Sequence, residues 1–411
     1  MLICTAFVAV AAFAAPAGAS PSMQYGIQDD AWLLYGDGTV QERIAELDSL
    51  GVDLVRFTID WSRVERQRGV RDWSGPDTVL RALRDARIQA LVSIWGSPRW
   101  ANSGRQPQWA PTSGASFASF ASAAARRYPW VNKWLIWNEP NQRRWLQPTT
   151  AVTYVTKLLN PAYAAIHRAN RRARVGGGVT APRASKGGVS PVQFIRGMKA
   201  ARARLDAYAH HPYPLFKGET PSAGGCDHCE TITMATLERL LREVSRNFGA
   251  KRIWLTEYGY QTNPPDRALG VSPALQARYL AEAAHRALTA PRVDMLIHYL
   301  YRDEPEVGRW QSGLVTTAGA EKPAHRAFKL PLVQASRKGV QAILWGQVRP
   351  GSGPQRYVLQ QRRNGVWQHV GGSRITSSRG FLSRTVRAPR GSIFRIWLPG
   401  EELASPTLVA G

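Results

Sequence analysis

Eight short apolar runs, each followed by a longer stretch with helical periodicity, predict a (β/α)8 barrel over most of this 411-residue chain. After residue 332 the pattern changes to short alternating runs separated by Gly, Pro or Asn, which predicts a small all-β sandwich. The predicted fold class is therefore α/β: a TIM barrel followed by a C-terminal sandwich domain.

The barrel prediction depends on the order of its elements. Strand-like runs rich in β-branched and aromatic residues cover 23–28, 52–59, 89–95, 132–137, 173–180, 205–211, 252–258 and 293–300. Helical periodicity, with Pro, Ser, Thr or Asp near the start, covers 40–50, 76–87, 115–128, 151–170, 235–248 and 272–288. Repeated strand–helix units favour a closed parallel sheet, and a doubly wound open sheet is the alternative.

The C-terminal runs are shorter and alternate in polarity. They cover 342–348, 356–363, 366–371, 381–386 and 392–398. Asn364-Gly365 lies between two of them and predicts a tight hairpin. We therefore predict four segments: 1–19, a barrel over 20–332, a sandwich over 338–399 and a tail over 400–411.

The first nineteen residues carry no charge and are almost wholly apolar. Their apolar run is shorter than the roughly 20 residues that span a bilayer. Ala17-Gly18-Ala19 has the small-x-small form of a cleavage site, although no basic residue precedes the apolar run. We predict a signal peptide and a secreted protein without a transmembrane segment. A buried N-terminal helix is the alternative.

The cysteines fit an exported chain. Cys4 belongs to the predicted signal, and Cys226 and Cys229 remain as an even pair in GGCDHCE. In an oxidising compartment such a pair predicts a disulfide. A metal site with His228, His210 or His211 is the alternative, but a structural zinc site usually has a second ligand pair at fitting spacing. No metal is predicted.

The formal net charge of +25 favours acidic partners such as an anionic polysaccharide. The basic residues are scattered, and most are Arg. No Lys/Arg-rich block with interleaved aromatic residues occurs, so the sequence predicts no specific nucleic-acid binding. A general bias of composition toward Arg is the preferred explanation of the charge. Oligomeric state cannot be read from the sequence.

Two glutamates end predicted barrel strands. Glu139 follows the fourth run in IWNEPN, and Glu257 ends the seventh run in RIWLTEY. Because catalytic groups in a TIM barrel lie where the strands end, both carboxylates should face the central mouth. Paired carboxylates facing a cleft are the apparatus of glycoside hydrolysis. This pattern alone does not say which glutamate is the acid.

The motifs WNEPN and TEYGY resemble those of clan A glycoside hydrolases, the retaining (β/α)8 enzymes, and in general character families 5 and 39. The resemblance covers about residues 25–330. It implies that Glu139 is the acid/base and Glu257 the nucleophile. It also implies that Asn138 hydrogen-bonds the sugar 2-hydroxyl, and that no cofactor is required.

Further residues match the family less tightly. His211 and Tyr213 resemble a His-x-Tyr pair that steadies the nucleophile, and Arg56 resembles an Arg that pairs with it. A structural role is the alternative for all three. Trp95 and Trp100 are candidates for stacking on sugar rings, although Trp is also a common core residue.

The sequence departs from the family after the eighth strand. Many members have a Trp there beneath the reacting sugar, whereas this chain reads IHYLYRDEPE. Tyr299, Tyr301 or Trp310 is therefore expected to take that place. The departure leaves the shape of the subsite, and with it the substrate, open.

The predicted function is an exported retaining hydrolase of β-linked oligosaccharide or polysaccharide. A non-catalytic carbohydrate-binding protein and a transglycosylase that uses the same glutamates are the alternatives. The stretch Gly176 to Ala181 matches a loose dinucleotide-binding pattern. Pro182 follows it, no helix start is evident and no acidic residue stands at the required distance, so no cofactor is predicted.

Overall fold

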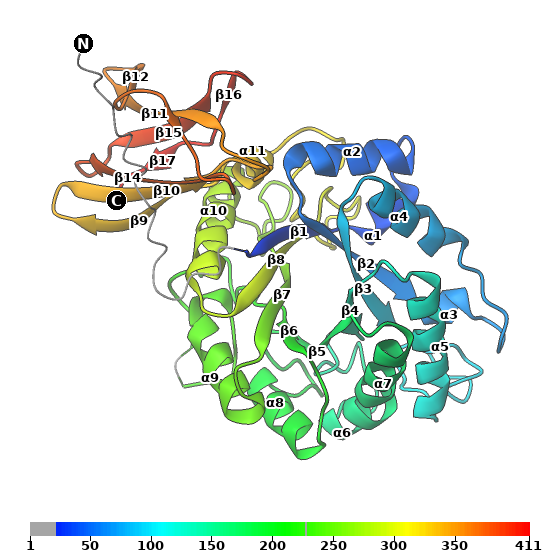
Figure 1. Ribbon diagram of the computed structural model, residues 1–411. Helices are drawn as coiled ribbons and strands as arrows, with labels where there is room; N and C mark the ends of the chain where they lie inside the picture. Colours follow the sequence, from blue (N-terminus) through cyan, green and yellow to red (C-terminus); the bar gives the residue numbers. More distant parts are fainter. Residues whose placement is uncertain (1–21, 227) are drawn as a thin grey trace, which may run out of the picture.

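A closed barrel of eight parallel strands lies at the centre of the computed structural model, which describes residues 22–226 and 228–411 (Figure 1). Each strand pairs with its sequence neighbours, and β1 pairs with β8 to close the sheet. The strands are β1 Gln24–Gln28, β2 Leu54–Asp60, β3 Gln89–Trp95, β4 Lys133–Ile136, β5 Arg174–Thr180, β6 Ala207–His210, β7 Arg252–Tyr258 and β8 Val293–Tyr299. The predicted barrel is confirmed, and the predicted signal segment 1–19 lies outside the described residues.

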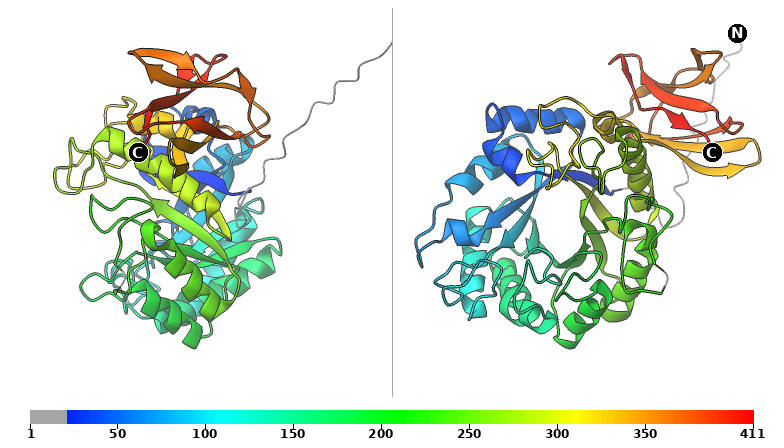
Figure 2. Two further views of the ribbon diagram at one scale, coloured as in Figure 1. Left: turned by 90° about the vertical axis from the view of Figure 1, so that its left-hand side faces the viewer. Right: turned by 180° about the vertical axis from the view of Figure 1, so that it is seen from behind.

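Helices surround the barrel on its outer face (Figure 2). The principal α-helices are α2 Val40–Leu50, α4 Ser74–Asp85, α5 Gly114–Arg127, α7 Asn160–Ala169, α8 Pro191–Ala200, α9 Leu237–Phe248 and α10 Pro273–Thr289. Shorter ones are α1 Asp30–Tyr35, α3 Trp61–Val64, α6 Ala151–Tyr154 and α11 Pro323–Lys329, with a π-helical turn at Val155–Leu159 and a 3-10 turn at Met234–Thr236. No helix in the described part of the chain is long and apolar enough to cross a membrane.

The C-terminal domain consists of two packed antiparallel sheets. One contains β9 Leu332–Lys338, β10 Gln341–Gln347 and β14 Phe381–Arg387. The other is built on β11 Arg356–Arg363 and β15 Ile393–Leu398, with β12 Val366–His369, β13 Arg374–Ile375, β16 Leu403–Ala404 and β17 Leu408–Val409. The hairpin at Asn364-Gly365 joins β11 to β12, and both of its turn residues have positive φ.

The sheets extend beyond the predicted limits of 338 and 399. β9 begins at Leu332, and its first residues face the core of the sandwich or the barrel. β16 and β17 lie in the predicted tail and pair with β15. These strands have two residues each, too short to show an alternation of polarity.

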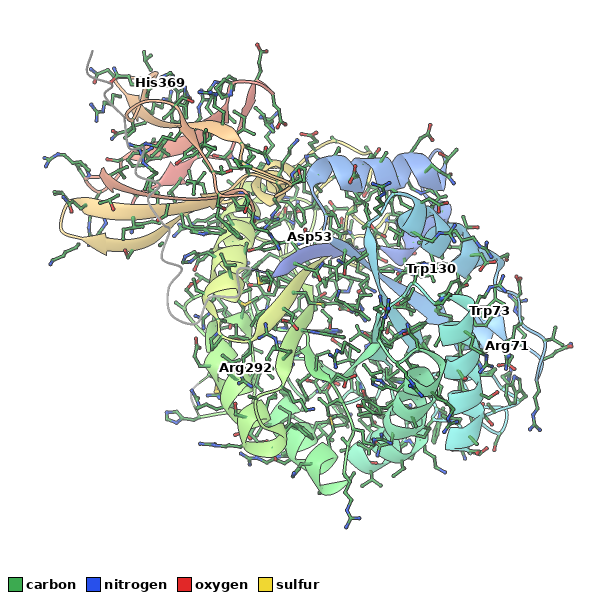
Figure 3. The ribbon with its side chains drawn as sticks, viewed as in Figure 1. Asp53, Arg71, Trp73, Trp130, Arg292 and His369 are labelled. Carbon is green, nitrogen blue, oxygen red and sulfur yellow. A yellow bond between two sulfur atoms is a disulfide. The ribbon has the colours of Figure 1, made fainter. Side chains whose placement is uncertain are left out.

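The sandwich packs against the barrel near β1 and α10. Trp345 of β10 lies 5.1 Å from the ring of His285. Arg349, only 1% exposed, places its guanidinium 3.5 Å above the Tyr25 ring and donates to the carbonyl of Phe328. Figure 3 labels Asp53, whose carboxylate accepts the backbone N–H of Tyr25 beside this junction. Packing is therefore one established role of the sandwich.

Arg349→Ala is expected to lower the free energy of unfolding by about 3 kcal/mol, because it removes a buried cation–π contact and leaves a void between the domains. Chemical denaturation followed by fluorescence measures the change. Arg356→Ala is the matched control in the same domain, because Arg356 is exposed. Equal effects of the two substitutions would contradict the structural role of Arg349.

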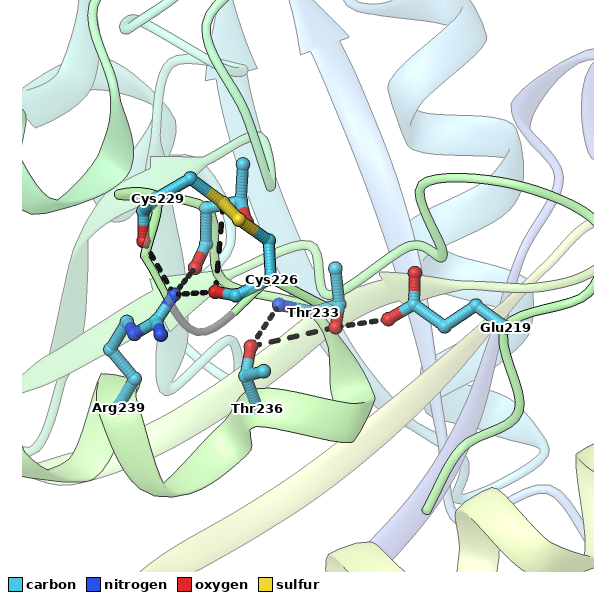
Figure 4. Close-up of a disulfide and its surroundings, with 7 residues drawn as sticks. Glu219, Cys226, Cys229, Thr233, Thr236 and Arg239 are labelled. Atoms are coloured by element: carbon cyan, nitrogen blue, oxygen red, sulfur yellow. Dashed lines mark hydrogen bonds between the residues drawn. A yellow bond between two sulfur atoms is a disulfide. The ribbon is translucent and has the colours of Figure 1, made fainter. Parts of the chain in front are cut away.

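The predicted disulfide is present. It joins Cys226 and Cys229 in the long loop after β6, and the Arg239 guanidinium donates to the carbonyls of both cysteines (Figure 4). Thr233, further along the loop, hydrogen-bonds Glu219. The bridge is therefore part of a local network that fixes this loop against α9.

Candidate active site

A cleft of about 890 Å³ opens among the loops that follow the barrel strands. Its volume is within the range of ordinary ligand sites. Of the residues predicted from sequence, those that line it are Arg56, Trp95, Asn138, Glu139, Tyr213, Glu257, Tyr299 and Trp310. The barrel therefore brings together residues that are as far as 254 positions apart in the chain.

Glu139 is presented by a tight turn just after β4. Its φ is +37°, a conformation that non-glycine residues rarely adopt and that is typical of functional sites. Its carbonyl accepts the N–H of Gln142, which closes the turn. Asn141 binds the backbone of Ala181 and Val189 beyond β5, at 2.8 and 3.0 Å. These bonds tie the turn after β4 to the segment that follows β5, and they hold Glu139 in its strained backbone conformation.

Glu257 lies within β7 and pairs with Arg56 of β2. The guanidinium Nη1 is 2.5 Å from the Glu257 carboxylate and also donates to the carbonyl of Thr256. Nη2 donates to the side-chain oxygen of Asn138 at 2.9 Å. Arg56 is 1% exposed, so its guanidinium is buried while it joins the Glu257 carboxylate to Asn138, the residue before Glu139.

His211 lies between the two glutamates. Its Nδ1 is 3.0 Å from Glu139 and 3.5 Å from Glu257, and its Nε2 is 3.2 Å from Arg56. A guanidinium can only donate, so Nε2 accepts and Nδ1 carries the proton. Burial lowers the pKa of His211 to about 3, so the ring is neutral near pH 7. His211 is therefore a fixed donor to the carboxylates.

Aromatic side chains cover the side of the cleft nearest Glu257. The Tyr213 hydroxyl donates to Glu257 at 3.1 Å, and the ring of Trp310 lies 4.9 Å from that of Tyr213. Tyr299 meets Trp310 edge-on at 5.4 Å. Burial, with the negative charge of Glu257, raises the pKa of Tyr213 well above its usual value, so the hydroxyl keeps its proton. These rings supply an apolar surface inside the cleft.

The two glutamates have different surroundings. Burial raises the pKa of Glu139 to about 7, and the positive charge of Arg56 opposes this only in part. Glu257 instead has the Arg56 cation in direct contact. The side chains keep 16% and 11% of their surface exposed, so both remain accessible from the cleft. Near neutral pH, Glu139 is able to hold a proton that it can donate.

Glu139, His211 and Glu257 place one ligand atom each within 4.8 Å of one another, and such a group could hold a metal ion. The chemistry of the site does not suit one, because the His211 Nδ1 that faces the carboxylates carries a proton. Arg56 already supplies a cation to Glu257. His210, considered as a ligand with the cysteines, bonds Thr180 and the carbonyl of Ile232 with its two ring nitrogens.

Two predicted stacking residues lie elsewhere. Trp100 lies outside the cleft: its indole N–H donates to the carbonyl of Glu65 and its ring meets Trp61 edge-on, so the prediction for Trp100 was wrong. Tyr301 stacks on Trp32 at 4.1 Å and is also outside the cleft. Both are packing residues, and a pattern search cannot tell a packed aromatic ring from a free one.

Sequence reasoning missed several residues of the cleft. Asp30 lies two positions after the end of β1 and accepts the N–H of Thr58. The rule that drew attention to Glu139 could have found it. Trp145 lies six positions after Glu139 and lines the cleft beside it, where it lowers the pKa of that carboxyl. Arg144 and Arg183 also line the cleft, but nothing in their local sequence distinguishes them from the many other arginines.

The chain is similar to known glycoside hydrolases, in sequence over its middle part and in fold over most of its length. Residues 105–295, which contain both glutamates, match the family described as the glycosyl hydrolase catalytic core. A family 39 glycoside hydrolase from Bacteroides cellulosilyticus WH2 has a TM-score of 0.63 at 17% identity, covering 90% of this chain and 80% of the other. No curated protein sequence matches the chain.

Two further solved structures have the same fold. A monomeric β-xylosidase from Caulobacter crescentus CB15 has a TM-score of 0.57 at 15% identity, covering 89% of this chain and 94% of the other. A glucosidase from Croceicoccus marinus has a TM-score of 0.60 at 13% identity, covering 91% and 95%. These structures share the fold of this chain. The match of residues 105–295 to the glycosyl hydrolase catalytic core agrees with the predicted resemblance to clan A and with the predicted enzyme class, a glycoside hydrolase.

Proposed function

We propose that this protein is an exported retaining β-glycosidase that cleaves a β-linked oligosaccharide or polysaccharide. The observation that carries the proposal is the approach of Glu139 and Glu257, which have carboxylate oxygens within 4.8 Å of one another and share His211. Retaining enzymes hold their carboxyl groups about 5–5.5 Å apart, whereas inverting enzymes need about 6.5–9.5 Å to admit a water molecule. The short approach favours retention.

In the first step a Glu257 oxygen attacks the anomeric carbon while the Glu139 proton passes to the leaving oxygen. The glycosidic bond breaks, and a covalent glycosyl-enzyme forms on Glu257. In the second step Glu139, now ionised, takes a proton from water as the water attacks the same carbon. Glu257 leaves as a carboxylate, and the anomeric configuration is restored.

The surrounding residues support these steps. Arg56 and Tyr213 hold the two oxygens of Glu257, which restricts the carboxylate to one orientation. His211 donates to Glu139 and thereby favours the ionised form that the second step needs. Asn138, held by Arg56, is placed to bind the sugar hydroxyl next to the reacting carbon. No bound group is needed for this chemistry.

Different observations support the proposed export and the proposed substrate. The uncharged apolar segment of residues 1–19 supports export. The aromatic rings that line the cleft support a pyranose substrate. The printed names of two structural neighbours, a β-xylosidase and a glucosidase, suggest the first sugars to test.

The test of the function is a panel of aryl glycosides that differ in sugar and in anomeric configuration. We expect release of the phenol from at least one aryl β-glycoside and none from its α-anomer. Binding of glycans without turnover of any β-glycoside would contradict the proposal and favour a non-catalytic carbohydrate-binding protein.

Tyr213→Phe is expected to lower kcat about tenfold, because the variant loses a buried hydrogen bond to the charged nucleophile. Steady-state kinetics on the best aryl β-glycoside measures the change. Tyr258→Phe is the matched control: it removes the hydroxyl of a buried tyrosine next to Glu257 in sequence, but that hydroxyl bonds Tyr260. Equal kcat values for the two variants would contradict the role given to Tyr213.

A further inference from the structure

The two halves of the cleft differ in charge. The half formed by the loops after β4, β5 and β6 contributes Arg144, Arg183 and Lys217 to the lining, and among the described lining residues of these loops Glu139 is the single carboxylate. The half formed near β1 and β2 contributes both signs, with Asp30, Asp60, Asp72, Arg63 and Arg66. Positive charge is therefore concentrated around the proposed acid.

The cations near Glu139 have no carboxylate partner among the described residues. Arg144, Arg183 and Lys217 are exposed, and none of them forms an ion pair with any residue in 22–226 or 228–411. In the other half, by contrast, Arg63 lies 3.3 Å from Asp60. Unpaired cations that line a cleft are available to a ligand and attract anionic groups into it.

Neighbouring residues position the two arginines. The Gln142 side chain binds the carbonyl of Arg183 and the N–H of Ser185, which ties the loop after β4 to the loop after β5. The Arg183 guanidinium donates to the carbonyl of Leu215 at 3.0 Å, and Arg144 lies 5.2 Å from the ring of Trp145. Both arginines lower the pKa of Glu139, which places them within electrostatic reach of its carboxyl.

The acid must contact the oxygen that leaves, so the part of the substrate beyond the cleaved bond lies beside Glu139. We propose that this leaving-group subsite binds an anion on the substrate, a carboxylate, sulfate or phosphate, through Arg144 and Arg183, with Lys217 adding positive charge. The inference rests on the proposed glycosidase function, and it names the substrate as a glycan with an acidic residue on the leaving-group side.

The test compares aryl β-glycosides that share one sugar but differ in the phenol. The phenol carries a carboxylate, a sulfate, a phosphate or a neutral carboxamide, with phenol acidity matched across the set. We expect kcat/KM of the wild type to be about tenfold higher for at least one anionic substrate than for the neutral one at low salt. The anion that gives the largest ratio identifies the group that the subsite recognises.

Arg144→Ala/Arg183→Ala is expected to abolish this preference while turnover of the neutral substrate continues. Arg66→Ala is the matched control, because it also removes one exposed, cleft-lining arginine but in the other half. It should retain the preference. Equal kcat/KM values for neutral and anionic substrates in the wild type, or a preference that survives the double substitution, would overturn the inference.

A binding measurement separates this inference from the proposed function. Calorimetry of the wild type and of Arg144→Ala/Arg183→Ala, each with the carboxylated and the neutral phenyl β-xyloside and β-glucoside, needs no turnover. Tighter binding of the anionic partner that depends on the two arginines, without hydrolysis, would support the subsite and contradict the glycosidase. Hydrolysis without any such difference in binding or turnover would support the glycosidase and overturn the subsite.

Discussion

Glu257→Ala is expected to lower kcat on aryl β-glycosides by about 10⁴-fold or more, because the nucleophile that forms the covalent intermediate is removed. Azide, a small anion that fits the space left by the carboxylate, should restore turnover of a substrate with a good leaving group. Attack then comes from the face opposite the leaving group, so the product should be an α-glycosyl azide. Nuclear magnetic resonance identifies this product.

The control for this experiment addresses folding. Arg56 is buried and loses its ion-pair partner in Glu257→Ala, so thermal unfolding of the variant must be compared with that of the wild type. Glu306→Ala, an exposed substitution in the loop after β8, should keep full activity. A folded Glu257→Ala protein with near wild-type kcat would show that another group is the nucleophile.

Glu139→Ala is expected to lower kcat/KM by about 10²- to 10⁴-fold for substrates with poorly acidic leaving groups, and far less for dinitrophenyl substrates. A dinitrophenolate leaves without protonation, so the missing acid matters little. Azide added to this variant should yield the β-glycosyl azide, since the covalent intermediate on Glu257 still forms. The anomeric configuration of this azide is opposite to that expected from Glu257→Ala.

The pH dependence of kcat/KM tests the role of Glu139 in the wild type. Burial raises the pKa of Glu139 to about 7, so the proton needed by the leaving oxygen is lost as pH rises through that value. We expect kcat/KM for a poor leaving group to fall above about pH 7, and this alkaline limb to be absent in Glu139→Ala. If kcat/KM of Glu139→Ala still fell above about pH 7, the fall would arise from the titration of another group.

The barrel could be predicted because the strands are short apolar runs and most of the connections between them carry helical periodicity. Glu139 and Glu257 could then be predicted as site residues, because a closed barrel brings the ends of distant strands together at one mouth. The C-terminal domain was predicted with less accuracy. β9 continues directly from the barrel at Leu332, and two-residue strands such as Leu408–Val409 exist only through pairing with β15.

The surroundings of the two glutamates could be predicted only in part. The family resemblance implied that Arg56 pairs with the nucleophile, and the structure shows an ion pair between Arg56 and Glu257. Trp100 could not be told from Trp95, since Trp95 ends β3, Trp100 follows five residues later, and the difference lies in tertiary packing. Arg144 and Arg183 stand out only when the structure shows which arginines lack a carboxylate partner.

His211 shows how the site depends on the whole barrel. It contacts groups from β2, from the turn after β4 and from β7, and its tautomer is set by Arg56 on the far side of the ring. A substitution at His211 would therefore change the surroundings of both glutamates together. The effects of Arg56, His211 and Tyr213 substitutions should be strongly non-additive for this reason.

The most direct test of the proposed retaining mechanism is the anomeric configuration of the first product. Proton nuclear magnetic resonance, recorded during the first minutes of hydrolysis of an aryl β-glycoside, distinguishes the two anomers before they interconvert. A double displacement through Glu257 predicts that the β-anomer appears first and that the α-anomer follows only by mutarotation. Initial formation of the α-anomer would show a single displacement by water and would contradict the assignment of Glu257 as a nucleophile.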